Sequence, residues 1–208
     1  MSDIIFISGI DTDAGKTYAT GIIARRLMAE GKSVITQKFI QTGNTDMSED
    51  ILKHREITGT GLLPEDTARL TAPVIFTYPA SAQLAAKLDG KSIDLDFIDR
   101  CSRQLSERYD TVLVEGAGGL MVPITDDFFT IDYVTTRRMP LILVTNGVLG
   151  SINHTLLSLE AIKSRGIRLL EVVYNTFFDN DKIIAADTSS FIKRYIERNF
   201  IGVKFTTI

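Results

Sequence analysis

The chain has 208 residues, of which 44% are hydrophobic and 24% are charged, and its net charge is −3, a composition that is ordinary for a globular protein. The net charge and the lack of a basic block give no sign of a nucleic-acid-binding surface, and the single cysteine excludes an internal disulfide. No stretch approaches the roughly 20 apolar residues of a membrane span, and the apolar start is too short for a secretory signal. The sequence therefore predicts a cytoplasmic protein with no membrane partner.

Five apolar runs rich in Ile, Val and Leu do not alternate with polar residues, which is typical of parallel strands covered on both faces. They lie at residues 4–8, 33–37, 111–115, 141–146 and 169–175. Segments with apolar residues at helical spacing follow them, at residues 16–30, 94–108, 151–165 and around 184–196. This order predicts an α/β protein, in which a mainly parallel sheet is flanked by helices on both faces.

Residues 41–79 are the least regular part of the chain, with short helices expected at 48–58 and 64–70. We interpret this stretch as an insertion over one end of the sheet, within a single domain spanning 1–208. In such folds, ligands bind beyond the carboxyl ends of the strands, so the loops that follow strands are the candidate site.

The first strand leads into the sequence SGIDTDAGKTY at residues 8–18. Gly9 and Gly15 allow positive φ and close approach, so that consecutive N–H groups can point at phosphate oxygens. Lys16 adds a charge beside the terminal phosphates, and Thr17 offers a hydroxyl to Mg²⁺ at a helix N-terminus. A simple glycine turn before a helix is the alternative, but the position between a buried strand and an amphipathic helix favours a P-loop NTPase-type nucleotide site.

The loop has five residues between its outer glycines, where the usual P-loop has four. ATPases of the partitioning and maturation type carry a second lysine five residues before the Gly-Lys-Thr lysine. Asp11 holds that place here. An acid cannot supply the charge that those proteins direct at the γ-phosphate, which counts against an ATP-driven switch.

Two further strands end in charged residues. Lys38 ends the second strand, which we expect beside the first, so its ammonium would face the same phosphates, and two converging lysines suit phosphoryl transfer. Glu115 ends the third strand before Gly-Ala-Gly-Gly and is expected to hold Mg²⁺ opposite Thr17. A solvated lysine and a solvated carboxylate are the alternatives. The three glycines indicate instead that the backbone comes close to a ligand.

The stretches GIDTDAGKT, KFIQTG and VEGAGGLMVPI, with LGSINHT further on, together resemble the dethiobiotin synthetase family of biotin biosynthesis. The similarity runs in order from residue 4 to about residue 176. Either the loop or the glycine-rich strand end alone would also suit cobyrinate-type amidating ligases. The resemblance implies an ATP- and Mg²⁺-dependent ligase that carboxylates 7,8-diaminononanoate with CO₂ through a carbamate and a carbamic-phosphoric anhydride. A partitioning-type ATPase that binds a protein partner remains the alternative.

The resemblance implies roles for individual residues. Lys16 and Lys38 would screen the repulsion between carbamate and triphosphate, and Thr12 would donate a hydrogen bond to the reacting oxygens. The implied ATP-binding residues are Asp13, Ala14, Gly15, Lys16, Thr17, Tyr18 and Asn175. Asn175 is expected on the adenine, and the guanine-reading pattern Asn-Lys-x-Asp is absent there. Thr17 and Glu115 match the family's Mg²⁺ ligands. The third ligand falls on Asp50, with Asp46 as the alternative because no motif fixes the spacing.

Substrate binding is implied at Thr12, Lys38, Thr42, Gly118, Ser151, Ile152 and Asn153. Ser151 is expected to be the N-cap of a helix whose free N–H groups at Ile152 and Asn153 form an anion site. The family places the substrate carboxylate there, across the two-fold interface of a homodimer. An ordinary capped helix is the alternative.

Several residues depart from the family pattern or receive no role. Phe39 stands where the family usually has proline, which leaves the aim of Lys38 less fixed, and residues 200–205 do not align with the family's adenine loop. We expect Cys101 in the core and His54 exposed on a polar helix. His154 lies near the implied substrate site, but amine attack on CO₂ does not require a general base.

Overall fold

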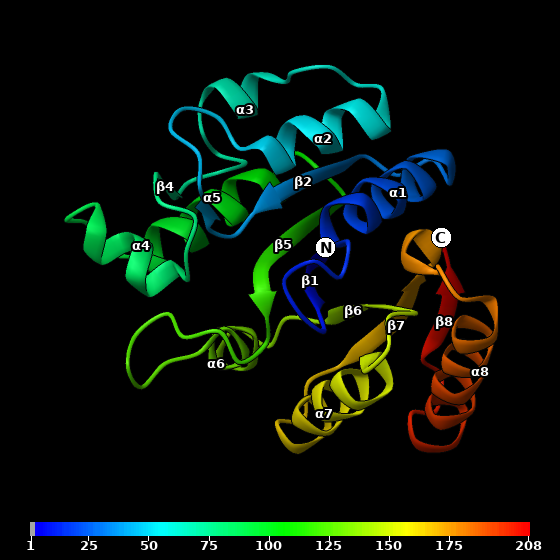
Figure 1. Ribbon diagram of the computed structural model, residues 1–208. Coiled ribbons are helices and arrows are strands. Elements are labelled where there is room, and N and C mark those ends of the chain that lie inside the picture. The colour runs from blue at the N-terminus through cyan, green and yellow to red at the C-terminus, as the bar shows by residue number, and fades with distance from the viewer. Residues whose placement is uncertain (1–2) are drawn as a thin grey trace.

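The computed structural model describes residues 3–208, and its centre is a six-stranded sheet whose neighbouring strands all run parallel (Figure 1). In the order of the sheet, the strands are β2 Val34–Lys38, β5 Thr111–Gly119, β1 Asp3–Gly9, β6 Leu141–Asn146, β7 Leu169–Asn175 and β8 Lys204–Thr207. A separate two-stranded sheet pairs β3 Gln41–Thr42 with β4 Ile75–Phe76. The predicted α/β class with a mainly parallel sheet is confirmed.

Eight α-helices and one short 3₁₀-helix occur within the described residues. The helices are α1 Lys16–Ala29, α2 Glu49–Thr58, α3 Pro64–Thr67, α4 Ala82–Leu88, α5 Leu95–Ser106, α6 Thr130–Thr136, α7 Ser151–Ser164, η1 Thr176–Phe178 and α8 Lys182–Asn199. None of the helices in this described range combines the length and apolarity that a membrane crossing requires.

Each strand sends alternate side chains to two apolar cores, one on each face of the sheet. On β1, Phe6 enters the core that α5, α6, α7 and α8 complete, whereas Ile7 enters the core that α1 completes. On β5, Val112 and Val114 enter the first core and Leu113 the second. The apolar runs do not alternate because both faces of the sheet are covered.

The strand order corrects one expectation. β5 lies between β1 and β2, so the prediction that the Lys38 strand borders the P-loop strand is wrong. Such crossovers reflect the packing of the connecting helices, which local sequence does not encode. Lys38 nevertheless lies level with the end of the P-loop strand. It pairs in register with Glu115 on β5, and Glu115 pairs with Ile7 on β1.

The predicted insertion contributes to both a face and one end of the sheet. Its helix α2 packs against α1 and β2, and a Cβ on Gly21 of α1 would lie 2.7 Å from Ile57 Cδ1. Its residues Thr42 and Asp50 lie over the strand ends, where they line a cavity. The short helices α4 and α6 and the strand β8 were not predicted. β8 has the sequence Lys-Phe-Thr-Thr, with a single large apolar residue, because it forms a half-exposed edge.

Candidate active site

The P-loop joins β1 to α1 and folds back tightly on itself. Gly15 caps α1 with φ of 87°, in the left-handed region that glycine adopts readily, and a side chain there would collide with Asn175 Nδ2. Gly9 does not use that region. It must be small for another reason, since a Cβ on Gly9 would lie 2.9 Å from the Asp11 carbonyl oxygen and 3.0 Å from Ala14 Cβ.

Lys16 is the first residue of α1, and its side chain turns back over the loop. Its Nζ donates hydrogen bonds to the carbonyl oxygens of Asp11 at 2.9 Å and Thr12 at 3.1 Å. Burial and the positive charge of Lys38 lower the pKa of Lys16 to about 8. A buried ammonium of this kind gains from a nearby anion, because the charge is then compensated.

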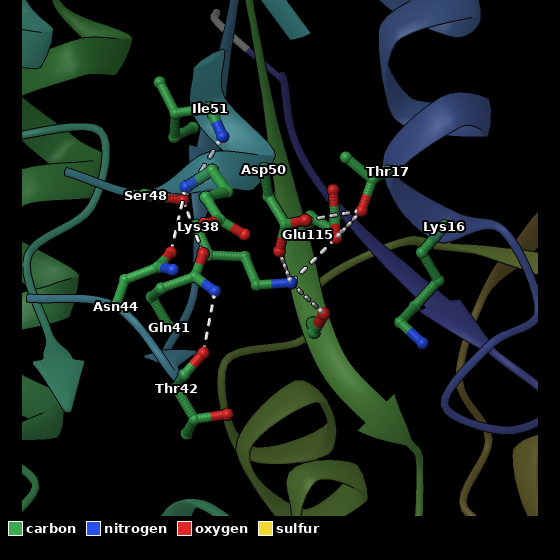
Figure 2. A network of polar contacts seen from close by, with 12 residues as sticks. Lys16, Thr17, Lys38, Gln41, Thr42, Asn44, Ser48, Asp50, Ile51 and Glu115 are labelled. Carbon is green, nitrogen blue, oxygen red and sulfur yellow. Dashed lines mark hydrogen bonds and ion pairs between the residues drawn. The ribbon is translucent and has the colours of Figure 1, made fainter. Parts of the chain in front are cut away.

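Thr17, Asp50 and Glu115 meet beside the middle of β5, level with Lys38 at the end of β2. Thr17 Oγ1 lies 2.8 Å from Asp50 Oδ1 and 3.0 Å from Glu115 Oε1 (Figure 2). Asp46, the alternative to Asp50, lies on the wall of a different cavity. The structure therefore brings together the three oxygen-bearing side chains that the resemblance implied as metal ligands, with Asp50 as the aspartate.

The start of α2 positions Asp50. Ser48 is the N-cap, and its Oγ accepts from Ile51 N at 3.2 Å while donating to Gln41 Oε1 at 2.5 Å. Asn44 Oδ1 accepts from Glu49 N at 2.9 Å. These contacts attach the start of α2 to β3 and to the loop after it, as Figure 2 shows. They therefore hold Asp50 so that it faces the cavity.

Lys38 lies at the floor of the site and is only 5% exposed. Its Nζ is 2.5 Å from Asp50 Oδ2 and 2.7 Å from Glu115 Oε1, and it donates to the Gly116 carbonyl at 3.2 Å. Burial alone would lower the pKa of Lys38, but the negative charges of Glu115 and Asp50 outweigh it and raise that pKa. The geometry excludes the alternative of a solvated surface lysine.

Glu115 is completely buried. Burial would raise the pKa of its carboxyl, but the charge of Lys38 and a hydrogen bond from His54 outweigh this and hold that pKa far below its usual range. The carboxylate is therefore ionised. Two of the glycines after it are required for different reasons. A Cβ on Gly116 would lie 2.8 Å from the Phe6 ring, whereas Gly118 has φ of 68°, in the left-handed region.

A cavity of about 320 Å³ opens above these groups. The expected site residues that line it are Thr12, Asp13, Gly15, Lys16, Thr17, Lys38, Thr42, Asp50, Glu115 and Gly118. Ile40, Gln41, Ala117 and Phe178 also line it and were not among the expected residues. One cavity thus joins the P-loop, the end of β2, the start of α2 and the end of β5.

Three of the expected nucleotide-binding residues lie at the edge of this arrangement. The Ala14 side chain is buried, whereas Tyr18 is 45% exposed on α1. Asn175 ends β7 beside Gly15, and its Oδ1 accepts from Phe177 N at 3.0 Å. Asn175 therefore caps η1 and places Phe178 at the rim of the cavity.

The α7 start departs from expectation. The N-cap is Gly150, with φ of 100°, and Ser151 is the first helical residue, so the prediction of a Ser151 cap is wrong. Ser151 Oγ donates instead to Asn146 Oδ1, because the left-handed turn at Gly150 directs this side chain into the interior. Ile152 and Asn153 follow in the first turn. All three lie outside the phosphate cavity.

A second cavity, of about 400 Å³, lies between α7 and the segment after β5. Ile10, Met121 and Leu157 give it an apolar wall. His154 and Asp11 stand at its edge, with His154 Nδ1 4.0 Å from Asp11 Oδ2.

Sequence reasoning missed His54. It was expected to be exposed, but it is completely buried and lies 2.7 Å from Glu115 Oε2 through Nε2. The signal was present in the spacing, since Ile51, His54 and Arg55 form the buried stripe of α2. The spacing was not recognised because histidine and arginine are polar, and such residues are uncommon in the interior without a partner.

Comparisons with known proteins identify the family. A family model described as an AAA domain matches residues 3–203. ATP-dependent dethiobiotin synthetase BioD 2 of Pasteurella multocida is 49% identical, over 95% of this chain and 93% of the relative. The Haemophilus influenzae protein of the same name is 53% identical, over 88% and 96%. ATP-dependent dethiobiotin synthetase BioD of Chlorobaculum tepidum is 46% identical, over 96% and 83%.

The chain belongs to the dethiobiotin synthetase family. The resemblance predicted from the loop sequences is thereby confirmed. Among solved structures, this dethiobiotin synthetase fold is similar to a ParA family ATPase from Chlorobium tepidum, with a TM-score of 0.56, 17% identity, and coverage of 100% of this chain and 85% of that one. The structure of pNOB8 ParA bound to nonspecific DNA gives a TM-score of 0.57, 19% identity, and coverage of 98% and 78%. These likenesses establish the P-loop NTPase fold and no more.

Proposed function

We propose that this member of the family is an ATP-dependent ligase that carboxylates 7,8-diaminononanoate with CO₂ and closes the ureido ring to give dethiobiotin. The proposed enzyme is one domain over residues 1–208 and acts in the cytoplasm. The observation that carries the proposal is that Lys16, at the start of α1, and Lys38, at the end of β2, line one cavity with Thr17, Asp50 and Glu115. That arrangement suits the meeting of two anions, a carbamate and a triphosphate.

The reaction would proceed in three steps. One substrate amine adds to CO₂ to form a carbamate. A carbamate oxygen then bonds to the γ-phosphorus while ADP leaves, and the second amine attacks the carbonyl carbon while phosphate leaves. Lys16 and Lys38 would screen the repulsion between the two anions, and Thr12 and Thr42 would donate hydrogen bonds to their oxygens.

Thr17, Asp50 and Glu115 fit a magnesium ion. They offer a hydroxyl and two carboxylates, the hard oxygen ligands that Mg²⁺ prefers, and the hydroxyl oxygen lies within 3.0 Å of both carboxylates. These residues would hold the ion, which when bound supplies positive charge beside the β- and γ-phosphates. The position of Lys38 supports this assignment, since its Nζ lies 2.5 Å from Asp50 Oδ2 and 2.7 Å from Glu115 Oε1, so the two carboxylates are close enough to contact one cation.

The nucleotide would lie along the P-loop. Backbone N–H groups from Asp13 to Tyr18 would cradle the phosphates, because the Ala14 side chain is buried and the Tyr18 side chain faces solvent. Asn175 supports adenine binding by its position beside Gly15.

The substrate carboxylate would bind at the start of α7, on the N–H groups of Ile152 and Asn153 next to Ser151, whose own N–H donates to the Val148 carbonyl at 2.9 Å. The backbone at Gly118 would border the reacting end. A homodimer would place the rest of this pocket on a second copy of the chain. The apolar wall of the second cavity supports this, since Met121 is 56% and Leu157 63% exposed on this face.

The direct test supplies purified protein with ATP, Mg²⁺, bicarbonate and 7,8-diaminononanoate. We expect one ADP and one phosphate for each cyclic urea, measured by coupled assay and mass spectrometry. A monoamine of the same length serves as the control, because it lacks the nucleophile for ring closure. ATP turnover that is indifferent to the diamine would contradict the proposal and favour a partitioning-type ATPase.

A further inference from the structure

His54 connects the phosphate site to the interior of the protein. The side chain extends from α2 to the paired strands β2 and β5, where it contacts Thr36 and Glu115, and it is completely buried. Its Nε2 lies 2.7 Å from Glu115 Oε2, and its Nδ1 lies 3.0 Å from Thr36 Oγ1. Both ring nitrogens therefore have a partner, and one of these partners, Glu115, lines the phosphate cavity.

The contacts of Arg55 are compatible with one set of directions for these hydrogen bonds. Its Nη1 donates to Thr36 Oγ1 at 2.9 Å, and a guanidinium can only donate. The Thr36 hydroxyl accepts that bond and has one proton left, which it can give to His54 Nδ1. His54 then carries its own proton on Nε2 and donates it to Glu115 Oε2.

Arg55 is itself fixed. Its Nε and Nη2 donate to the two carboxylate oxygens of Asp66, both at 2.8 Å, and Thr71 Oγ1 donates to Asp66 at 2.7 Å. Arg55 is 4% and Asp66 5% exposed. A fork of this kind restricts the guanidinium to one plane. The position of Thr36, and through it that of the His54 ring, is therefore set by rigid contacts away from the site.

The two carboxylate oxygens of Glu115 therefore have different partners. Oε2 accepts from His54, while Oε1 faces Thr17 at 3.0 Å and Lys38 at 2.7 Å. The terminal torsion of a glutamate is broad, so a carboxylate without a second anchor can rotate about it. His54 removes that freedom and leaves one oxygen directed at the phosphate cavity.

We propose that His54 is a positioning residue that orients Glu115 for the cation and phosphate site. The inference rests on the proposed function in one respect, which is that Glu115 binds Mg²⁺. Hydrogen bonds to a metal-binding carboxylate or histidine commonly change metal affinity or activity by about 10–100-fold when the partner is removed. The same range is expected here.

The test compares three substitutions at one position. His54→Gln can place an amide nitrogen close to the position of Nε2 and still donate to Glu115. His54→Leu fills the space without a donor, and His54→Asn keeps a polar partner for Thr36 but does not reach Glu115. Lys53→Ala, at the preceding and exposed position of α2, is the matched control.

The main measurement is the affinity of the ADP-bound protein for Mg²⁺, by calorimetry or by competition with Mn²⁺. We expect His54→Leu and His54→Asn to weaken it by about 10–100-fold, and His54→Gln to restore most of it. Thermal unfolding identifies variants that are folded, and His54→Asn carries the test if His54→Leu is not. Wild-type Mg²⁺ affinity in a folded His54→Leu or His54→Asn variant would overturn the proposal.

This measurement does not depend on product formation. If the protein makes no cyclic urea but Mg²⁺ binding responds to His54 as described, the proposed reaction fails and the role of His54 stands. If the cyclic urea forms and Mg²⁺ affinity is indifferent to His54, the reverse holds.

Discussion

Lys38→Ala lowers kcat for cyclic urea formation by about 10²–10³, with a smaller change in KM for ATP. A preorganised charge that faces the reacting phosphoryl group stabilises the transition state more than the bound substrate, and its loss commonly has an effect of this size. Lys16 remains in the variant and continues to hold the triphosphate. The measurement is steady-state ADP release at saturating diamine, bicarbonate and Mg²⁺.

Two controls separate chemistry from folding. Lys38 compensates two carboxylates, so its loss also brings Asp50 and Glu115 into repulsion, and thermal unfolding must be followed with and without Mg²⁺. Lys53→Ala removes an exposed lysine from α2 and should leave kcat unchanged. A folded Lys38→Ala protein with wild-type kcat would remove Lys38 from the mechanism.

Glu115→Gln lowers the free energy of unfolding by about 3–5 kcal/mol in the absence of Mg²⁺. Removing one member of a buried ion pair leaves the other charge without compensation, and losses of this size are typical. Glu115 is completely buried and contacts both Lys38 and His54. Urea denaturation of the wild type and the variant measures the difference.

A double-mutant cycle with Lys38→Met isolates the pair. We expect the double variant to lose less stability than the sum of the single variants, with a coupling energy of about 1–3 kcal/mol. Glu171→Gln is the matched control, because Glu171 is also buried but pairs with Arg26. Its effect should add to that of Lys38→Met. Additivity between positions 38 and 115 would show that the pair contributes nothing to stability.

The sequence predicted the central strands well because burial on both faces requires long apolar runs. It did not predict β8, an edge strand with few apolar residues, or the place of β5 between β1 and β2. Strand order depends on how the connecting helices pack, and no local signal records that. Ser151 was predicted to be the N-cap of α7 because serine is a preferred N-cap residue. The N-cap in the structure is Gly150, which adopts a left-handed conformation.

The candidate site was predicted from charged residues expected at or just after strand ends. Lys38 does end β2 and Lys16 begins α1 after the loop that follows β1, whereas the prediction that Glu115 ends its strand is wrong, because β5 continues to Gly119. The parallel register still brings Lys38 and Glu115 side by side. Asp50 could not be separated from Asp46, because the turn that presents it depends on contacts of Ser48 and Asn44. His54 was missed because its partners, Thr36 and Glu115, are remote in sequence.

A crystal structure with Mg²⁺, a non-hydrolysable ATP analogue and 7,8-diaminononanoate tests the central idea most directly. We expect Lys16 Nζ and Lys38 Nζ each to lie about 2.7–2.9 Å from an oxygen of the same γ-phosphate, with the diamine beside that phosphate. A triphosphate bound out of reach of Lys38, with its ammonium still held only by Asp50, Glu115 and Gly116, would contradict this account.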